Sequence, residues 1–113
     1  MNKRANPEEL VSSLLNRSIC AVQVAACVVD HYGVFSWSWN HSGSDGFGEH
    51  AEIHCFRRAN RSRLFGATLY VAAQRRRNSK VVTARPCVEC QKLVDYYWLD
   101  VRYRDGKGVW IKL

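Results

Sequence analysis

Residues 19–29 form an almost continuous apolar stretch, and this stretch limits the choice of fold more than any other feature. Nearly every side chain from Ile19 to Val29 is small, β-branched or otherwise apolar, which is typical of a central strand covered on both faces. Periodicity alone does not distinguish it from a buried helix. After His31-Tyr32-Gly33, which predicts a turn, Val34–Asn40 alternates strictly: Phe35, Trp37 and Trp39 fall on one face, and Ser36, Ser38 and Asn40 on the other. The two segments therefore predict a β-hairpin.

The rest of the chain predicts three helices and three more strands. Pro7-Glu8-Glu9 combines an early proline with first-turn carboxylates, which favours a helix start. Helical spacing also runs from His50 to near Arg61 and from Cys87 to Tyr96. Strands are expected over 67–73, 98–103 and 109–113, the last two joined by an Asp-Gly turn. The order α-β-β-α-β-α-β-β predicts an α/β fold: a five-stranded mixed sheet with three helices, its last two strands forming an antiparallel hairpin.

Length and composition narrow the class of protein. A chain of 113 residues with 47% hydrophobic and 24% charged residues has room for one domain, residues 1–113, with a proper core. The longest unbroken apolar run, Val24–Val29, is far shorter than the ~20 residues of a membrane span. Residues 1–7 lack the apolar stretch of a secretory signal. We therefore expect a soluble cytoplasmic protein with no membrane partner.

Positive charge is concentrated in the middle of the chain. Seventeen Lys and Arg against ten Asp and Glu give a formal net charge of +7, which favours a polyanionic or phosphorylated partner. Nine of these basic residues lie between Glu52 and Glu89, where the sequence has no acidic residue: Arg57, Arg58, Arg61, Arg63, Arg75, Arg76, Arg77, Lys80 and Arg85. Clustering alone does not distinguish a binding surface from a solvated one.

Two short motifs carry the chemistry. Cys87 and Cys90 are spaced i and i+3 in the first turn of the helix expected after Pro86, so one cation can take both thiolates. The helix N-terminus favours their ionisation. His50 supplies a third ligand, which leaves one tetrahedral position open, as in catalytic zinc sites. Glu52, two residues further on, is close enough to move a proton of water whose pKa zinc lowers.

The other cysteines and histidines have simpler interpretations. Five cysteines are an odd number, and without a signal peptide a disulfide framework is not expected. Cys20, Cys27 and Cys55 have apolar neighbours and are interpreted as core thiols. A purely structural zinc site would need a fourth ligand, for which His54 is the candidate. That alternative does not explain why Pro86 precedes the cysteine pair or why the carboxylate of Glu52 lies beside the metal.

His50-Ala51-Glu52 and Pro86-Cys87-Val88-Glu89-Cys90 resemble the signature of the zinc-dependent cytidine and deoxycytidylate deaminase superfamily. Ala67–Val71 resembles the strand that tRNA adenosine and deoxycytidylate deaminases place before the cysteine helix. Asn40 stands about where many members carry an asparagine that bonds the ribose. The resemblance covers essentially the whole chain and implies the three-layer cytidine deaminase fold, a Zn²⁺ cofactor on His50, Cys87 and Cys90, and Glu52 as the catalytic proton carrier.

The chain also departs from well-known members of that superfamily. Its expected terminal hairpin is similar to that of free-nucleoside cytidine deaminases and of bacterial toxin and phage deaminases, whereas polynucleotide editors tend to insert a helix there. His50 replaces the cysteine of typical tetrameric cytidine deaminases, and Arg85 stands where relatives often have serine or glutamate. The chain is most similar to a compact phage-like or bacterial branch, which implies the cytoplasm of a bacterial or phage-infected cell.

The resemblance implies hydrolytic removal of the exocyclic amine of a nucleobase. Cytosine in a (deoxy)cytidine nucleoside or nucleotide is favoured by the short chain and the terminal hairpin. Backbone groups near Ala51 and Pro86 are expected to hold the base, and Asn40 the sugar, with Arg85 as a further substrate contact. Phosphate contacts are expected at the mouth of the pocket from Arg75, Arg76, Arg77 and Lys80. Trp37, Trp39 and Phe47 are candidates for stacking on the base, with core packing preferred for the two tryptophans.

Two other functions stay open at this point. Editing of cytosine or adenine in single-stranded DNA or RNA is favoured by the excess of basic residues, which could follow a phosphate backbone. A non-catalytic nucleic-acid-binding relative with a structural zinc is the other alternative, and an intact Glu52 argues against it. Assembly into a homo-oligomer is also left open.

Overall fold

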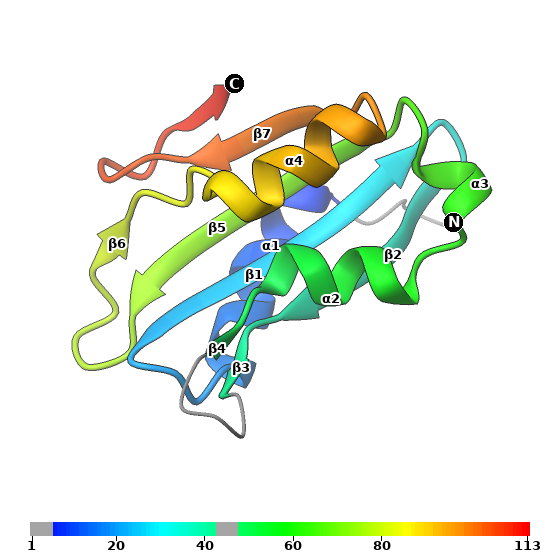
Figure 1. Cartoon of the computed structure of the whole chain (residues 1–113). Helices are drawn as coiled ribbons and strands as arrows, with labels where there is room; N and C mark the ends of the chain where they lie inside the picture. Colours follow the sequence, from blue (N-terminus) through cyan, green and yellow to red (C-terminus); the bar gives the residue numbers. More distant parts are fainter. Residues whose placement is uncertain (1–5, 43–47) are drawn as a thin grey trace, which may run out of the picture.

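The computed structural model describes residues 6–42 and 48–113. Its centre is a sheet with the strand order β2-β1-β5-β7-β8 (Figure 1). The strands are β1 (Val22–Asp30), β2 (Gly33–Trp39), β5 (Thr68–Arg75), β7 (Asp100–Arg104) and β8 (Trp110–Lys112). Strands β5 and β7 are parallel, whereas the β1–β2, β1–β5 and β7–β8 pairs are antiparallel. The mixed sheet and its antiparallel C-terminal hairpin confirm the prediction.

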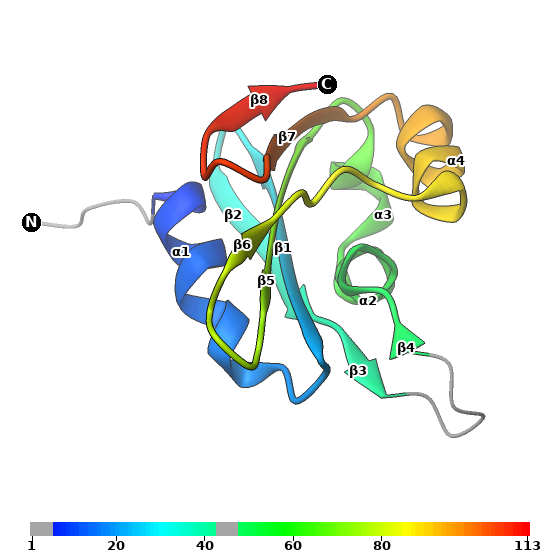
Figure 2. The same ribbon diagram turned by 90° about the vertical axis from the view of Figure 1, so that its left-hand side faces the viewer.

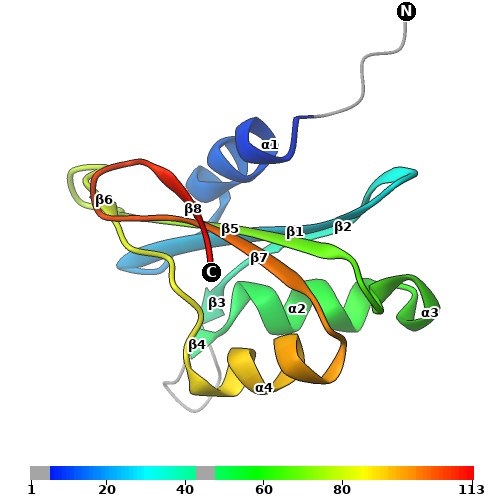
Figure 3. The ribbon, with the colours of Figure 1, turned by 90° about the horizontal axis from the view of Figure 1, so that it is seen from above.

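Helices cover both faces of the sheet, so that the molecule has three layers (Figures 2 and 3). Helix α1 (Pro7–Leu14) and the short 3₁₀ turn η1 (Leu15–Arg17) lie on one face. The opposite face carries α2 (Ala51–Arg58), α3 (Arg61–Leu64) and α4 (Val88–Tyr96). Helix α1 begins as expected, because the Asn6 side chain accepts hydrogen bonds from the first backbone amides after Pro7. None of the helices in the described part of the chain is long and apolar enough to cross a membrane.

Strand β1 is apolar on both faces because a cluster of apolar side chains lies on each side of it. Ala25 and Cys27 belong to the cluster under α1, and Ala26 and Val28 to the larger cluster under α2 and α4. All four side chains are fully buried. This double burial explains the apolar stretch and confirms the interpretation as a central strand.

The polar segment after β5 forms a further hairpin. Strand β6 (Val81–Val82) pairs antiparallel with the end of β5, so the sheet has six strands where the sequence predicts five. The N–H of Arg75 donates to the carbonyl of Lys80 at 2.8 Å and closes this hairpin. A separate antiparallel pair of two-residue strands, β3 (His41–Ser42) and β4 (Gly48–Glu49), lies before α2.

The single helix predicted from His50 to near Arg61 is in fact two helices. Helix α2 ends at Arg58, and both Ala59 and Asn60 have extended backbone. The Asn60 side chain accepts a hydrogen bond from the Ser62 N–H and thereby caps α3. Asn60 therefore starts a new helix and does not continue the face of the previous one.

The alternation in β2 is interrupted by a bulge. Val28 pairs with Ser36 and Val29 with Val34, which leaves Phe35 without an opposite residue in β1. Phe35 consequently packs on the α2 side, while Trp39 packs on the α1 side. The predicted shared face of Phe35, Trp37 and Trp39 is therefore wrong for Phe35.

The serine face of β2 is the buried one. Ser36 and Ser38 are 4% and 1% exposed. The buried Ser36 hydroxyl has a hydrogen-bond partner in α2, because it donates to the Cys55 carbonyl at 2.7 Å. Trp37 is 42% exposed, so the expectation of core packing is wrong for this tryptophan. The small serine side chains allow α2 to approach the sheet closely.

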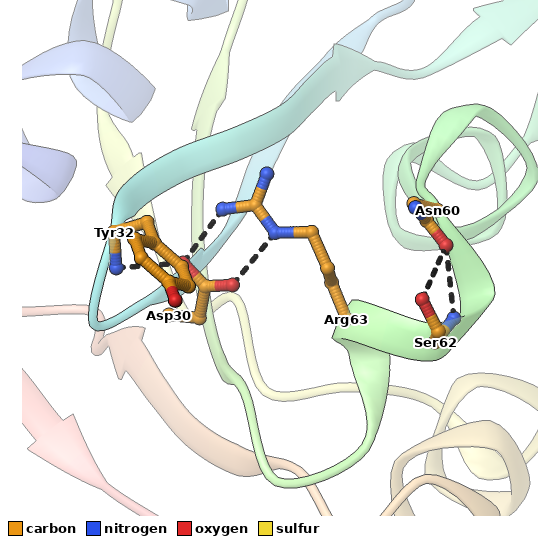
Figure 4. A network of polar contacts seen from close by, with 5 residues as sticks. All are labelled: Asp30, Tyr32, Asn60, Ser62 and Arg63. Atoms are coloured by element: carbon orange, nitrogen blue, oxygen red, sulfur yellow. Dashed lines mark hydrogen bonds and ion pairs between the residues drawn. The ribbon is translucent and has the colours of Figure 1, made fainter.

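An ion pair fastens α3 to the turn between β1 and β2 (Figure 4). The Asp30 carboxylate accepts hydrogen bonds from Nε and Nη2 of Arg63, each at 2.7 Å, and from the Tyr32 N–H at 2.9 Å. The Arg63 guanidinium also stacks on Phe35, 4.3 Å from the ring centroid. This contact fixes the far end of the α2–α3 segment to the sheet.

Candidate metal centre

Two helix N-termini bring a histidine and two cysteines together. His50 is the N-cap of α2, Cys87 is the N-cap of α4, and Cys90 lies in the first turn of α4. The Nδ1 atom of His50 is 3.5 Å from Sγ of Cys87 and 3.7 Å from Sγ of Cys90. The possible ligand atoms of these three residues all lie within 4.8 Å of one another. They are positioned to hold a metal ion.

The geometry and chemistry of this group fit zinc. Zn–S bonds of about 2.3 Å and Zn–N bonds of about 2.0–2.1 Å at tetrahedral angles place a sulfur and a nitrogen ligand about 3.6 Å apart. The two observed sulfur–nitrogen distances lie on either side of that value. Thiolate and imidazole are also the ligands that zinc prefers over the harder divalent cations.

His54 does not complete a four-ligand site. Within the described residues, the group of potential metal ligands contains His50, Cys87 and Cys90 and does not include His54. The ring of His54 packs against that of His41, with centroids 4.5 Å apart. Three protein ligands with two of them exposed leave room for a further, non-protein ligand.

Glu52 and Cys90 are buried beside each other at this centre. Glu52 is 4% exposed and Cys90 is fully buried. Burial raises the pKa of the Glu52 carboxyl, and a hydrogen bond from Cys90 and the nearby His50 oppose that rise. Burial, together with Glu52 and Cys87, raises the pKa of the Cys90 thiol. A cation bound here would favour the thiolate, because its positive charge offsets these unfavourable contributions.

A cavity of about 360 Å³ opens onto the metal ligands. His50, Glu52 and Cys87 line it together with three residues that the sequence assigned to substrate contacts, namely Asn40, Ala51 and Arg85. Pro86 is not part of this wall and borders a neighbouring hollow with Arg85. The structure thus brings six of the twelve predicted site residues to the wall of one cavity.

The wall also contains residues that sequence reasoning missed. Val22 and Val24 from β1 and Ala73 from β5 form part of it, because the sheet face under α2 continues to the start of that helix. Thr83 and Ala84 complete it from the segment before α4. Thr83 and Ala84 could have been predicted from the sequence, because they directly precede the Arg85-Pro86 segment that was assigned to substrate contacts.

The predicted phosphate contacts lie outside the cavity wall. Arg75, Arg76, Arg77 and Lys80 are exposed on the β5–β6 hairpin. Arg75 is two residues beyond Ala73 in β5, so its side chain leaves the strand on the same face as that wall residue. Arg76 is tied back to the segment before β1, since its Nη1 donates to the Ile19 carbonyl at 3.3 Å.

The two tryptophans considered as stacking residues are not at the cavity. Neither Trp37 nor Trp39 belongs to its wall. Trp37 lies on the outer strand of the sheet beside Arg58, whose Nη1 donates to the Trp37 carbonyl at 3.2 Å. Phe47 lies outside the described residues.

Comparisons with known proteins agree with this geometry. A family model described as "Cytidine and deoxycytidylate deaminase zinc-binding region" matches residues 7–99. No curated protein sequence matches the chain significantly. Among solved structures, the chain is similar to cytidine deaminase from Burkholderia pseudomallei, with a TM-score of 0.74 and 16% identity over 95% of this chain and 88% of that one. At this identity the likeness concerns the fold alone. Because the family match spans most of the sequence and includes the metal-binding group, the chain belongs to the zinc-binding cytidine and deoxycytidylate deaminase family.

Proposed function

We propose that the chain is a zinc-dependent hydrolytic deaminase that converts cytosine to uracil in a (deoxy)cytidine nucleoside or nucleotide and releases ammonia. One observation carries this proposal: Glu52, Asn40 and the ligands His50 and Cys87 all line a single cavity of about 360 Å³. Such a volume lies near the lower end of the range for small-molecule sites, roughly 300–1,000 Å³. The cavity therefore suits a single nucleoside or nucleotide.

Each residue has a separate role in this proposal. His50, Cys87 and Cys90 hold the zinc ion, which when bound supplies a Lewis acid that lowers the pKa of water. The Glu52 carboxylate accepts a proton from the attacking water and delivers it to ring nitrogen N3 as the water oxygen adds to C4 of cytosine. Glu52 then carries the second proton, from the new hydroxyl group on C4, to the amine, and the C4–N4 bond breaks to give uracil and ammonia.

The remaining wall residues orient the substrate. Backbone groups near Ala51, and near Pro86 just outside the wall, hold the base; Asn40 contacts the sugar, and Arg85 is an exposed cation at the rim. The apolar side chains of Val22, Val24 and Ala73 supply a surface for the flat base. These roles place the amine-bearing side of the base toward Glu52.

Replacing Glu52 tests the proposed chemistry. Glu52→Ala should keep zinc and the fold while turnover of cytidine or deoxycytidylate falls by at least ~100-fold, the usual scale for losing a general acid–base group. Glu89→Ala is the control, because it removes an exposed carboxylate from the first turn of α4. Unchanged turnover in Glu52→Ala would contradict the assigned mechanism, and loss of zinc would make Glu52 a structural residue.

A single-stranded polynucleotide is the second candidate substrate. The observation that favours it is the exposed β5–β6 hairpin, with Arg75, Arg76, Arg77 and Lys80 close to one another in the sequence. Several neighbouring cations suit several neighbouring phosphates better than they suit one. A purely structural zinc is less well supported, since the group of ligands in the described part of the chain has three members.

A further inference from the structure

We propose that Ser18 is a positioning residue for the substrate cavity. Its hydroxyl fixes the side chain of Asn40 so that Asn40 offers the cavity one N–H donor and no acceptor. The inference rests on the proposed function, because it specifies which nucleoside groups that cavity accepts. It concerns a residue that is neither a metal ligand nor part of the cavity wall.

The hydrogen-bonding capacity of Asn40 is almost fully used inside the protein. Its Oδ1 accepts from the Val24 N–H at 2.9 Å and from the Ser18 hydroxyl at 2.6 Å. Its Nδ2 donates to the Val22 carbonyl at 2.9 Å. A side-chain amide has two acceptor positions and two N–H groups. One N–H therefore remains for a molecule bound in the cavity that Asn40 lines.

These partners determine which way the amide faces. The Val24 N–H can only donate and the Val22 carbonyl can only accept, so a reversed amide would place donor against donor and acceptor against acceptor. The backbone N–H of Asn40 also donates to the Val24 carbonyl at 2.9 Å. Asn40 is thus held to the start of β1 by both its backbone and its side chain.

Ser18 is itself held firmly. It is 2% exposed, and its hydroxyl oxygen accepts from the Cys20 N–H at 3.2 Å, which leaves the hydroxyl hydrogen for Asn40. Its carbonyl accepts from Nε2 of the buried Gln23 at 2.7 Å. Gln23 in turn accepts through Oε1 from Gln74 at 2.8 Å. A buried serine with both hydroxyl partners assigned has a defined orientation.

This arrangement restricts which groups of a bound nucleoside can contact Asn40. The group that meets Asn40 must accept a hydrogen bond, as the oxygen of a sugar hydroxyl does. Removing the Ser18 hydroxyl would free one acceptor position on Oδ1 and remove one of the three bonds that hold the amide. The nucleoside that uses this contact should then lose affinity, and one that lacks the hydroxyl groups should not.

The direct test follows the side-chain amide of Asn40 by ¹⁵N NMR without any ligand. In the native protein one Nδ2 hydrogen should exchange slowly, because it is bonded to Val22, and the other quickly. In Ser18→Ala the slow hydrogen should exchange faster. Ser13→Ala is the matched control, because Ser13 is exposed and its hydroxyl donates to the Leu10 carbonyl. Unchanged exchange in Ser18→Ala would overturn the positioning role.

The second measurement compares cytidine with 2′,3′-dideoxycytidine, which lacks the 2′- and 3′-hydroxyls of the sugar and keeps the 5′-hydroxyl. Losing one hydrogen bond of ordinary strength should reduce the preference for cytidine in kcat/KM by about 3- to 10-fold in Ser18→Ala, chiefly through KM. Zinc content and turnover at saturation should be nearly unchanged. Equal losses for both nucleosides would overturn the link between Ser18 and the sugar. Failure of the native protein to bind any cytidine compound would count against the proposed function, while the exchange measurement would still decide whether Ser18 holds Asn40.

Discussion

At the scale of single residues, the five cysteines show how position decides chemistry. Cys87 and Cys90 lie at the start of α4 beside an imidazole. Cys27 and Cys55 are fully buried, and burial raises the pKa of Cys55 to about 12 and that of Cys27 well above its usual range. Their place in the two buried apolar clusters confirms them as core thiols, whereas Cys20 is only partly buried. The residue type alone therefore does not identify the ligands.

The first prediction concerns these ligands. The purified protein should contain about one zinc per chain, and Cys87→Ser/Cys90→Ser should contain almost none, because one imidazole alone binds zinc weakly. Cys20→Ser is the control, since it removes a partly exposed thiol outside the metal group. Elemental analysis of the three proteins measures the difference. Zinc that persists in the double variant would show that the ion binds elsewhere.

At the scale of elements, the pieces that carry the site follow from local patterns in the sequence. The apolar stretch gives β1, and a proline followed by a Cys-x-x-Cys pair gives the start of α4. Tertiary packing determines the features of the elements that these local patterns do not predict. The bulge that turns Phe35 toward α2 depends on the pairing of β2 with β1, which no local pattern records.

Some features that the sequence analysis did not predict are nevertheless indicated by a local residue preference. The helix predicted from His50 to near Arg61 runs through Asn60, although asparagine favours helix caps over helix interiors, and Asn60 caps α3 here. The cavity wall is different. Val22 and Ala73 reach it because antiparallel pairing of β1 with β5 brings both strands beneath the start of α2. Such long-range registration cannot be read from spacing along the chain.

The second prediction concerns the contact between Asp30 and Arg63. Hydrogen bonds from Arg63 lower the pKa of Asp30 to about 2, below the value of about 3.9 expected for the unfolded chain. The ionised carboxylate therefore stabilises the fold above about pH 4, and this contribution disappears as the pH falls toward about 2. The melting temperature of the native protein should fall over this interval more steeply than that of Asp30→Asn.

Thermal denaturation followed by circular dichroism between about pH 2 and pH 7 measures the effect. Asp95→Asn is the control, because Asp95 is an exposed carboxylate bonded to Gln91 on α4. Its melting temperature should follow the pH in parallel with that of the native protein. Parallel curves for Asp30→Asn as well would mean that Asp30 contributes no pH-dependent stability.

At the scale of the whole molecule, the positive charge is spread more widely than the cavity requires. The net charge of +7 includes exposed cations on α2, on the β5–β6 hairpin and near the C-terminus, among them Arg57, Arg77 and Lys112. Of the nine basic residues between Glu52 and Glu89, Arg85 is the one in the cavity wall. The β5–β6 hairpin is the charged element nearest in sequence to that wall. Changing its cations should therefore have different effects with the two candidate substrates.

The last prediction uses this difference. With a mononucleotide, one or two hairpin cations meet a single phosphate. Neutralising Arg75, Arg76, Arg77 and Lys80 to Gln should then raise KM for deoxycytidylate, leave that for deoxycytidine unchanged, and affect kcat little. The matched control neutralises four exposed cations elsewhere, namely Arg61, Lys92, Lys107 and Lys112. If the hairpin cations are merely solvated, neither set of changes alters KM.

A polynucleotide would behave differently, because several phosphates are neutralised together. Binding of a short single-stranded oligonucleotide to the Glu52→Ala protein would weaken with a log–log salt slope near −0.7 per phosphate contacted. Measuring this binding from ~50 to ~200 mM salt separates the two cases. We expect no measurable binding at the lowest salt, in keeping with a small substrate. A steep salt dependence that flattens in the hairpin variant, but not in the control, would instead favour a polynucleotide, because only multiple phosphate contacts along one strand produce such a slope.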